Sequence, residues 1–141
     1  QVVERLDLER MKIIHTLQLP VTSFLEWVEN VYGYHAESYF DAFQHIQSYA
    51  RIEAPKELKN RYFSEDIPTG LVPLASLGKA LGIKTPVMNS LIHLANTLMG
   101  ENYFHTGRTI ERVGVPQELL ERPLRTEVPF QFEYDDLREK I

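Results

Sequence analysis

The spacing of apolar residues along the chain predicts helices over most of its length. Residues 1–18 carry their apolar side chains near one face of a helix, and Pro20 prevents that helix from continuing. A second helix is predicted to begin at Ser23, because Ser23 and Glu26 have the spacing of a capping box, and to end near Gly33. Local signals therefore bound the first two helices.

Later helices are also bounded by turn and cap residues. Leucines at helical spacing lead up to Gly82, which is a stop signal. Thr85 followed by Pro86 is a start signal, because a capping side chain precedes proline at the first helical position, and Gly100 closes the helix that follows. The remaining predicted helices are 38–49, 71–81, 86–99, 110–113 and 116–122.

Two stretches do not fit a helical period. Between residues 51 and 69 charges and aromatics lie side by side, and we expect no regular structure there beyond a short turn at Pro55. Residues 123–141 contain an alternating apolar pattern (Val128, Phe130, Phe132 and Tyr134), which predicts an extended arm packed on the domain or on a neighbour. The predicted fold class is all-α: a single helical domain of about six to seven helices over residues 1–122, with an extended C-terminal tail over 123–141.

Composition narrows the class of protein. A length of 141 residues fits one domain, and a hydrophobic fraction of 43% with a charged fraction of 25% disfavours disorder. The net charge of −5 and the absence of a basic block argue against a nucleic-acid binder. No apolar run approaches the ~20 residues of a membrane span, and the first residues do not read as a signal peptide.

The absence of cysteine excludes disulfides, thiolate chemistry and cysteine-based zinc sites. It fits a reducing compartment, so we expect a cytoplasmic protein. The five histidines are scattered and form no metal-binding spacing, so no metal site is predicted. His93 lies within an apolar helix and is interpreted as a partly buried helix residue rather than a catalytic one.

The irregular stretch offers the first candidate chemistry. Arg61 could hold a carboxylate through two parallel hydrogen bonds, and Asp66 could orient a histidine that transfers protons. The alternative is a surface ion pair of Arg61 with Glu65 or Asp66 that fixes a loop. Spacing alone favours the ion pair.

A second candidate is Gly107-Arg108-Thr109. Glycine permits a close approach of the backbone to another group, and Arg108 could bind an acid. The alternative is a connection between helices in which Arg108 caps carbonyl groups. From these three residues alone, the structural role is favoured.

Residues 61–115 closely resemble the C-terminal helical domain of the octopine/nopaline (opine) dehydrogenase family. The elements of the family pattern occur in order: RYFSEDIP at 61–68, GLVP at 70–73, a Leu-Gly pair, TP at 85–86 and GRT at 107–109. Upstream residues extend the resemblance to about residue 5. The family has a helical domain related to those of 6-phosphogluconate and glycerol-3-phosphate dehydrogenases.

The resemblance implies a function and site residues. Opine dehydrogenases condense an amino acid with a 2-oxo acid and reduce the imine with NAD or NADP, which an N-terminal Rossmann domain binds. By this resemblance Arg61 is a substrate-binding residue, and Asp66 is the catalytic partner of a histidine that lies before this chain. Arg108 is a further substrate-binding candidate, equally open to a packing role.

The resemblance also implies what this chain lacks. No Gly-x-Gly-x-x-Gly fingerprint is present, and the chain opens at Gln1 without an initiator Met. We therefore expect the Rossmann domain to be absent from this chain and the chain alone to be inactive. Two alternatives stay open: a helical dimerisation or interaction module, and a non-catalytic binder of a small acid. Substrate binding predicts that Arg61 and Asp66 converge on one solvent-reachable pocket, whereas an assembly role predicts unrelated faces.

Overall fold

The computed structural model describes residues 1–121, and every regular element in that range is a helix. In chain order the α-helices are α1 (Val2–Thr16), α2 (Phe24–Tyr32), α3 (Tyr39–His45), α4 (Gln47–Ala50), α5 (Val72–Ala80), α6 (Pro86–Met99), α7 (Tyr103–Thr106) and α8 (Ile110–Val113). A π-helix, η1 (Tyr62–Leu71), leads directly into α5, and a 3₁₀-helix, η2 (Gln117–Leu119), follows α8. The predicted all-α class is confirmed for these residues, while the predicted tail over 123–141 lies outside them.

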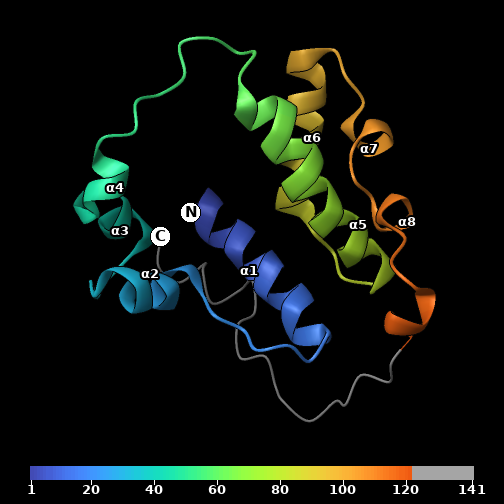
Figure 1. Ribbon diagram of the computed structural model, residues 1–141, viewed down its shortest axis with the longest axis horizontal. Helices are drawn as coiled ribbons and strands as arrows, with labels where there is room; N and C mark the ends of the chain where they lie inside the picture. The colour runs from blue at the N-terminus through green and yellow to red at the C-terminus, as the bar shows by residue number, and fades with distance from the viewer. Residues whose placement is uncertain (122–141) are drawn as a thin grey trace.

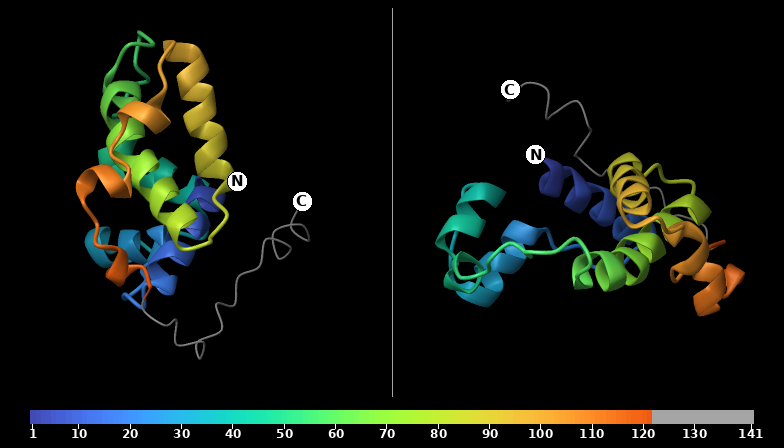
Figure 2. Two further views of the ribbon diagram at one scale, coloured as in Figure 1. Left: turned by 90° about the vertical axis from the view of Figure 1, so that its right-hand side faces the viewer. Right: turned by 90° about the horizontal axis from the view of Figure 1, so that it is seen from above.

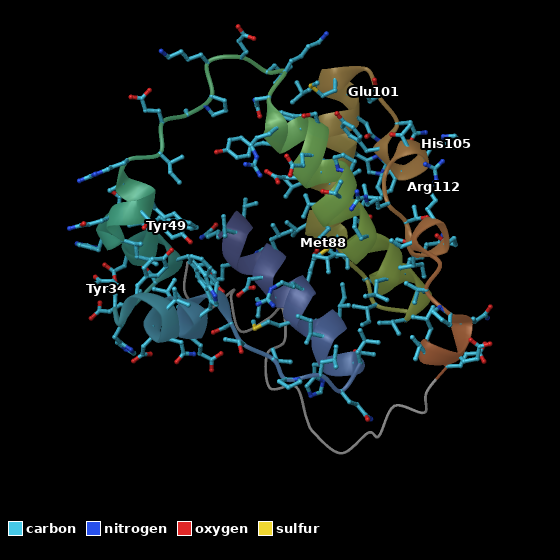
Figure 3. All side chains as sticks on the ribbon, viewed as in Figure 1. Tyr34, Tyr49, Met88, Glu101, His105 and Arg112 are labelled. Atoms are coloured by element: carbon cyan, nitrogen blue, oxygen red, sulfur yellow. The ribbon has the colours of Figure 1, made fainter. Side chains whose placement is uncertain are left out.

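Helix α1 lies between two groups of helices (Figure 1). On one side it packs on α5 and α6, and η1 and α7 complete that group. Ile13 of α1 and Met88 and Ile92 of α6 are fully buried at the centre of this group. Met88 lies where α1, α5 and α6 come together (Figure 3). None of the helices in residues 1–121 has the length and apolar character needed to cross a membrane.

Helices α2, α3 and α4 form the second group, on the other side of α1 (Figure 2). Its buried residues form a hydrophobic cluster of their own, built from Val28, Ala36, Ala42 and Ile46. The ring of Phe24 stacks on those of Tyr39 and Phe43, with centroids 5.4 and 5.2 Å apart. Within residues 1–121 the structure therefore contains two hydrophobic clusters, and residues 17–23 and 51–60 connect them along the chain.

Two acidic residues of α1 form hydrogen bonds to the two groups of helices, one to each group. Asp7 accepts hydrogen bonds from the backbone N–H of Phe24 and from the hydroxyl of Tyr39, each 2.8 Å long. Glu9 is fully buried and accepts the backbone N–H groups of Val87 and Met88, at 2.7 and 2.9 Å. Each acid thus satisfies N–H groups that the first turn of another helix leaves without a partner.

The predicted start of α6 is correct, but its capping group is not. Thr85 was expected to cap this helix with its side chain, and the structure shows no such bond. The carboxylate of Glu9 takes that place, from a helix about 78 residues earlier in the chain. By contrast, the capping box of Ser23 and Glu26 is confirmed, as is the left-handed Gly33 that ends α2.

The expectation of irregular structure over residues 51–69 holds for residues 51–60 but is wrong for residues 62–69. Those residues belong to η1, which carries Pro68 in its interior. A π-helix has i→i+5 hydrogen bonds and a wider turn than an α-helix, so the 3.6-residue template does not detect it. The wider turn also relieves the clash between an interior proline ring and the carbonyl four residues earlier.

Two further predicted helices differ from those observed. The helix expected over residues 38–49 is divided at Ile46, whose extended backbone (ψ 114°) separates α3 from α4. The helix expected from Pro116 shortens to the single turn of η2, and Arg122 lies outside the described residues. Elsewhere the observed bounds lie within a few residues of the predicted ones.

Candidate functional site

The segment with the candidate side chains begins at Asn60. The side-chain oxygen of Asn60 accepts the backbone N–H of Tyr62 at 2.9 Å, and its carbonyl accepts the N–H groups of Phe63 and Ser64. Asparagine is a good residue for the start of a helix, because its short side chain satisfies first-turn donors. This signal was present in the sequence and could have indicated a helix after residue 60.

Arg61, Glu65 and Asp66 lie together at the start of η1. The Arg61 guanidinium is 3.6 Å from a carboxylate oxygen of Glu65 and 4.0 Å from one of Asp66. The side chains are 69%, 59% and 51% exposed, respectively, so all three can be reached from solvent. The structure thus brings two of the sequence-predicted site residues together with Glu65, as exposed ion pairs of the kind that the alternative interpretation expected.

These distances leave the guanidinium available to a ligand. Both exceed the length of a charge-assisted hydrogen bond, which is about 2.7–2.9 Å. An exposed ion pair of this kind contributes only about 0–1 kcal/mol to stability. The five N–H donors of Arg61 can therefore turn to an incoming carboxylate without a large loss of folding free energy.

Arg108 reaches the same helix by its backbone and not by its guanidinium. Its N–H donates a 2.8 Å hydrogen bond to the carbonyl of Pro68, while its side chain is exposed. Gly107 is buried, and a Cβ there would meet the Pro68 carbonyl oxygen at 3.0 Å and that of Tyr103 at 2.6 Å. The close approach that the glycine was expected to permit is therefore an approach to η1.

The histidines lie elsewhere. His93 was expected to be partly buried but is exposed, with its ring 5.0 Å from that of Phe104. His45 lies 2.7 Å from Asp41, a carboxylate that also accepts the hydroxyl of Tyr34. Within residues 1–121, no group of three or more His, Cys, Asp or Glu side chains is placed to hold a metal ion.

The pKa values of Tyr39 and Asp41, outside the candidate site, are among those that burial and hydrogen bonds shift. Burial and the hydrogen bond to Asp7 raise the pKa of the Tyr39 hydroxyl well above its usual range. The backbone N–H of Glu37 and the hydroxyl of Tyr34 hold the pKa of Asp41 below its ordinary value. Sequence reasoning missed Asp7, Glu9 and Asp41, because acids at helical spacing look like solvent-exposed residues until their partners are known.

A cavity of about 650 Å³ opens near the C-terminal end of α5, away from the start of η1 where Arg61 lies. It is lined by α5, the turn at 82–85, the start of α6, and residues of α7 and α8. Neither Arg61 nor Asp66 lines it. Substrate binding predicted that Arg61 and Asp66 converge on one pocket. The two side chains do lie together on η1, but on an exposed surface, and the cavity lies away from them.

Comparison with known proteins points to one family. Residues 1–99 match the family model described as NAD/NADP octopine/nopaline dehydrogenase, alpha-helical domain. That match includes Arg61 and Asp66 and ends before Gly107-Arg108-Thr109.

Similar proteins carry related names. The chain is 37% identical over 112 residues to an opine dehydrogenase of Arthrobacter sp. (strain 1C), covering 79% of this chain and 31% of that protein. It is 29% identical over 113 residues to the protein ocs of Agrobacterium tumefaciens (strain Ach5), covering 80% and 32%. It is 31% identical over 108 residues to a vitopine synthase of Allorhizobium ampelinum, covering 77% and 30%. The chain spans about a third of the length of these relatives.

Proposed function

The chain belongs to the NAD/NADP octopine/nopaline dehydrogenase family, and on that premise we propose that it is the substrate-binding helical domain of an opine-dehydrogenase-like oxidoreductase. The observation that carries the proposal is the exposed guanidinium of Arg61 beside the carboxylate of Asp66. Both residues lie in the part of the chain that matches the family model.

The proposed reaction joins two carboxylate-bearing substrates. The amino group of an amino acid condenses with the carbonyl of a 2-oxo acid and releases water, and the imine is then reduced to a secondary amine. Bound NADH or NADPH supplies the hydride. The protein has to fix at least one acid group and deliver a proton to nitrogen.

The residues of this chain match those tasks. Arg61 holds a substrate carboxylate through two parallel N–H bonds. Asp66 orients a histidine from outside this chain and stabilises its protonated form, so that the imidazolium donates a proton near neutral pH. Arg108 is a second substrate contact. Its backbone N–H is bonded to Pro68 of η1, and its side chain is exposed and can bind a second acid group. Asp66 is thus the catalytic residue, and Arg61 and Arg108 are substrate-binding residues.

The cofactor does not fit the residues described here. A dinucleotide pyrophosphate is held at a glycine-rich turn between a strand and a helix, and residues 1–121 contain helices only. We therefore assign NAD or NADP binding to an N-terminal Rossmann domain outside this chain. The chain without that domain is inactive.

The complete enzyme is proposed to be a cytoplasmic protein and a candidate homodimer.

The direct test is an assay of the full-length protein. Oxidation of NADH and NADPH is followed with pyruvate or 2-oxoglutarate against a panel of amino acids, with this chain alone as the inactive comparison. Turnover that requires both substrates supports the proposal. A folded full-length protein that turns over no pair contradicts it.

A substitution pair then tests Arg61. Arg61→Ala removes the guanidinium and should raise the KM for the 2-oxo acid or amino acid, lowering kcat/KM about 100-fold. Arg51→Ala is the matched control, because Arg51 is also exposed but lies outside η1. Equal effects of the two substitutions would remove Arg61 from the site.

The alternative function is a dimerisation or interaction module. It draws support from Leu94 and Leu98, which lie one turn apart on α6 and are 56% and 46% exposed. If this face joins two copies, Leu94→Glu with Leu98→Glu converts a dimer to a monomer in light scattering without unfolding it. A wild-type chain that stays monomeric at high concentration excludes this alternative.

A further inference from the structure

The carbonyl of Pro68 lacks the donor that its own helix would supply. In the register of η1 the N–H of Val72 donates to the carbonyl of Ile67, five residues earlier. The same register pairs the carbonyl of Pro68 with the N–H of residue 73. Residue 73 is proline and has no N–H.

The segment after α7 supplies the missing donor. The N–H of Arg108 reaches the Pro68 carbonyl at 2.8 Å. Gly107 makes this approach possible, because a Cβ there would lie 3.0 Å from that carbonyl oxygen and 2.9 Å from Cγ1 of Val72. A partly buried carbonyl left without a donor is unfavourable, so this bond stabilises the π-helical turn around Pro68.

The donor is held from both sides. Before it, the N–H of Tyr103 donates to the side chain of Asn96 in α6 at 2.9 Å, and Tyr103 is buried. After it, the N–H of Ile110 donates to the hydroxyl of Ser76 in α5 at 3.0 Å. Figure 1 shows α7 and α8 beside η1 and α5, which follow one another along the chain. Figure 3 places His105 and Arg112 on these two short helices. The Gly107–Arg108 peptide is therefore clamped between α5 and α6.

The register of η1 decides whether Asp66 lies beside Arg61 together with Glu65. In an α-helix, residues five apart point about 140° away from each other, since each residue turns about 100°. In a π-helix the wider turn brings position i+5 onto the same face as position i, next to position i+4. Asp66 is five residues after Arg61 and Glu65 is four, so an α-helical register would keep Glu65 beside Arg61 and turn Asp66 away.

We infer that the Gly107–Arg108 peptide is a positioning element, whose N–H holds η1 in the π register that sets Asp66 beside Arg61. Its catalytic consequence rests on the proposed function. The peptide itself does not touch substrate in this role, which is separate from any contact made by the Arg108 guanidinium.

One pair of substitutions separates the backbone from the side chain. Arg108→Ala removes the guanidinium and keeps the N–H, whereas Arg108→Pro removes both. The backbone of Gly107 (φ −74°, ψ 176°) suits a residue that precedes proline, and Arg108 has no positive φ. Proline can thus occupy position 108, and its main effect is to remove the N–H that bonds to Pro68. Because η1 loses this bond, its amide hydrogens should exchange about fivefold faster in Arg108→Pro than in Arg108→Ala.

In the full-length protein the same pair is compared by kinetics. Arg108→Pro should lower kcat about tenfold or more below Arg108→Ala, because Asp66 is misplaced. The KM for the nicotinamide cofactor should not change. Adding Pro73→Ala returns a donor for the Pro68 carbonyl and should restore both exchange and kcat in the Arg108→Pro protein.

Two glycine substitutions repeat the test by another route. Gly107→Ala pushes the peptide away from Pro68 and should act like Arg108→Pro. Gly70→Ala is its matched control within η1, because a Cβ at Gly70 meets nothing within 4 Å. Even if Arg108→Pro fails to fold, the comparison of the two glycine variants and the Pro73→Ala rescue decide the inference.

The inference and the proposed function can fail separately. Equal η1 exchange in Arg108→Pro and Arg108→Ala, with no effect of Gly107→Ala, overturns the positioning role whatever the activity. A wild-type protein without turnover overturns the proposed function, and amide exchange still decides whether the peptide sets the register. Changed exchange with unchanged kcat overturns the catalytic consequence.

Discussion

At the scale of single residues, α1 carries the groups that hold the fold together. Its buried surface includes Asp7 and Glu9 as well as Ile13, so an acid-rich helix face is internal. A buried carboxylate is stable only when its oxygens accept hydrogen bonds. The first turns of α2 and α6 provide these donors, and the helix dipole favours negative charge at the same ends.

Glu9→Gln should destabilise the chain by about 1–3 kcal/mol. The amide keeps the shape of the side chain but replaces one acceptor with an NH₂ group that faces a backbone N–H. Urea unfolding followed by circular dichroism measures the loss. Glu53→Gln, on the exposed connection between α4 and η1, should change the free energy of unfolding little. Equal effects would show that the Glu9 carboxylate does not act as a cap.

Asp41 makes the α3 region sensitive to acid. Its folded pKa is held below the ordinary value of about 4, first by the N–H of Glu37 and then by the hydroxyl of Tyr34. A depressed carboxyl pKa stabilises the fold above the unfolded pKa, and this contribution is lost as pH falls through the folded pKa. The stability difference between wild type and Asp41→Asn should therefore be present at pH 6 and shrink below about pH 4. A difference that does not change with pH would contradict this role.

At the scale of elements, the two kinds of helix start differ in where their caps come from. The start of α2 is local: Ser23 accepts the N–H of Glu26, and Glu26 accepts that of Ser23 at 2.7 Å. The start of α6 depends on a residue of α1. The first can be predicted from a window of four residues, and the second cannot.

Ser23→Ala should cost about 0.5–2 kcal/mol, because the N–H of Glu26 loses its acceptor at the start of α2. Ser48→Ala in α4 is the matched control, since Ser48 is exposed and lies inside a short helix. Thermal unfolding of the two variants gives the comparison. A Ser23 variant as stable as the control would show that water replaces the cap.

At the scale of the whole molecule, the two hydrophobic clusters of residues 1–121 have no residue in common. Asp7 of α1 links them through Phe24 and Tyr39, and Arg10 adds a bond to the carbonyl of Thr22 at 2.7 Å. Local opening of a protein occurs in cooperative units that follow such divisions. Helices α2–α4 are therefore expected to open as one unit, separately from α5 and α6.

Asp7→Asn should loosen that unit selectively. The N–H of Phe24 and the hydroxyl of Tyr39 both donate to Asp7. In the asparagine variant one carboxylate oxygen is replaced by an NH₂ group, which cannot accept these bonds. Amide exchange in α2–α4 should become about tenfold faster, while exchange in the core of α6 changes little. Tyr39→Phe removes only one of the bonds and should give a smaller change. Uniform acceleration through α6 would indicate one cooperative unit instead of two.

The sequence by itself determined the helical class, the caps of α2 and the family. Apolar periodicity, the Ser23 capping box and Gly33 act over a few residues, and the motifs around Arg61 and Asp66 are continuous in the chain. Such signals can be read without knowing which segments meet. The assigned roles of Arg61, Asp66 and Arg108 remain predictions that the experiments above test.

Only the tertiary structure decided how the site helix is built and held. The Glu9 cap of α6 and the bond from Arg108 to Pro68 each join groups about 40 or more residues apart in the chain. The π register of η1 depends on a turn that is wider than that of an α-helix. A missing proline N–H is visible in the sequence, but its substitute donor is not. Hydrogen bonds of this kind are set by packing, because a buried polar group takes whichever partner the fold brings within reach.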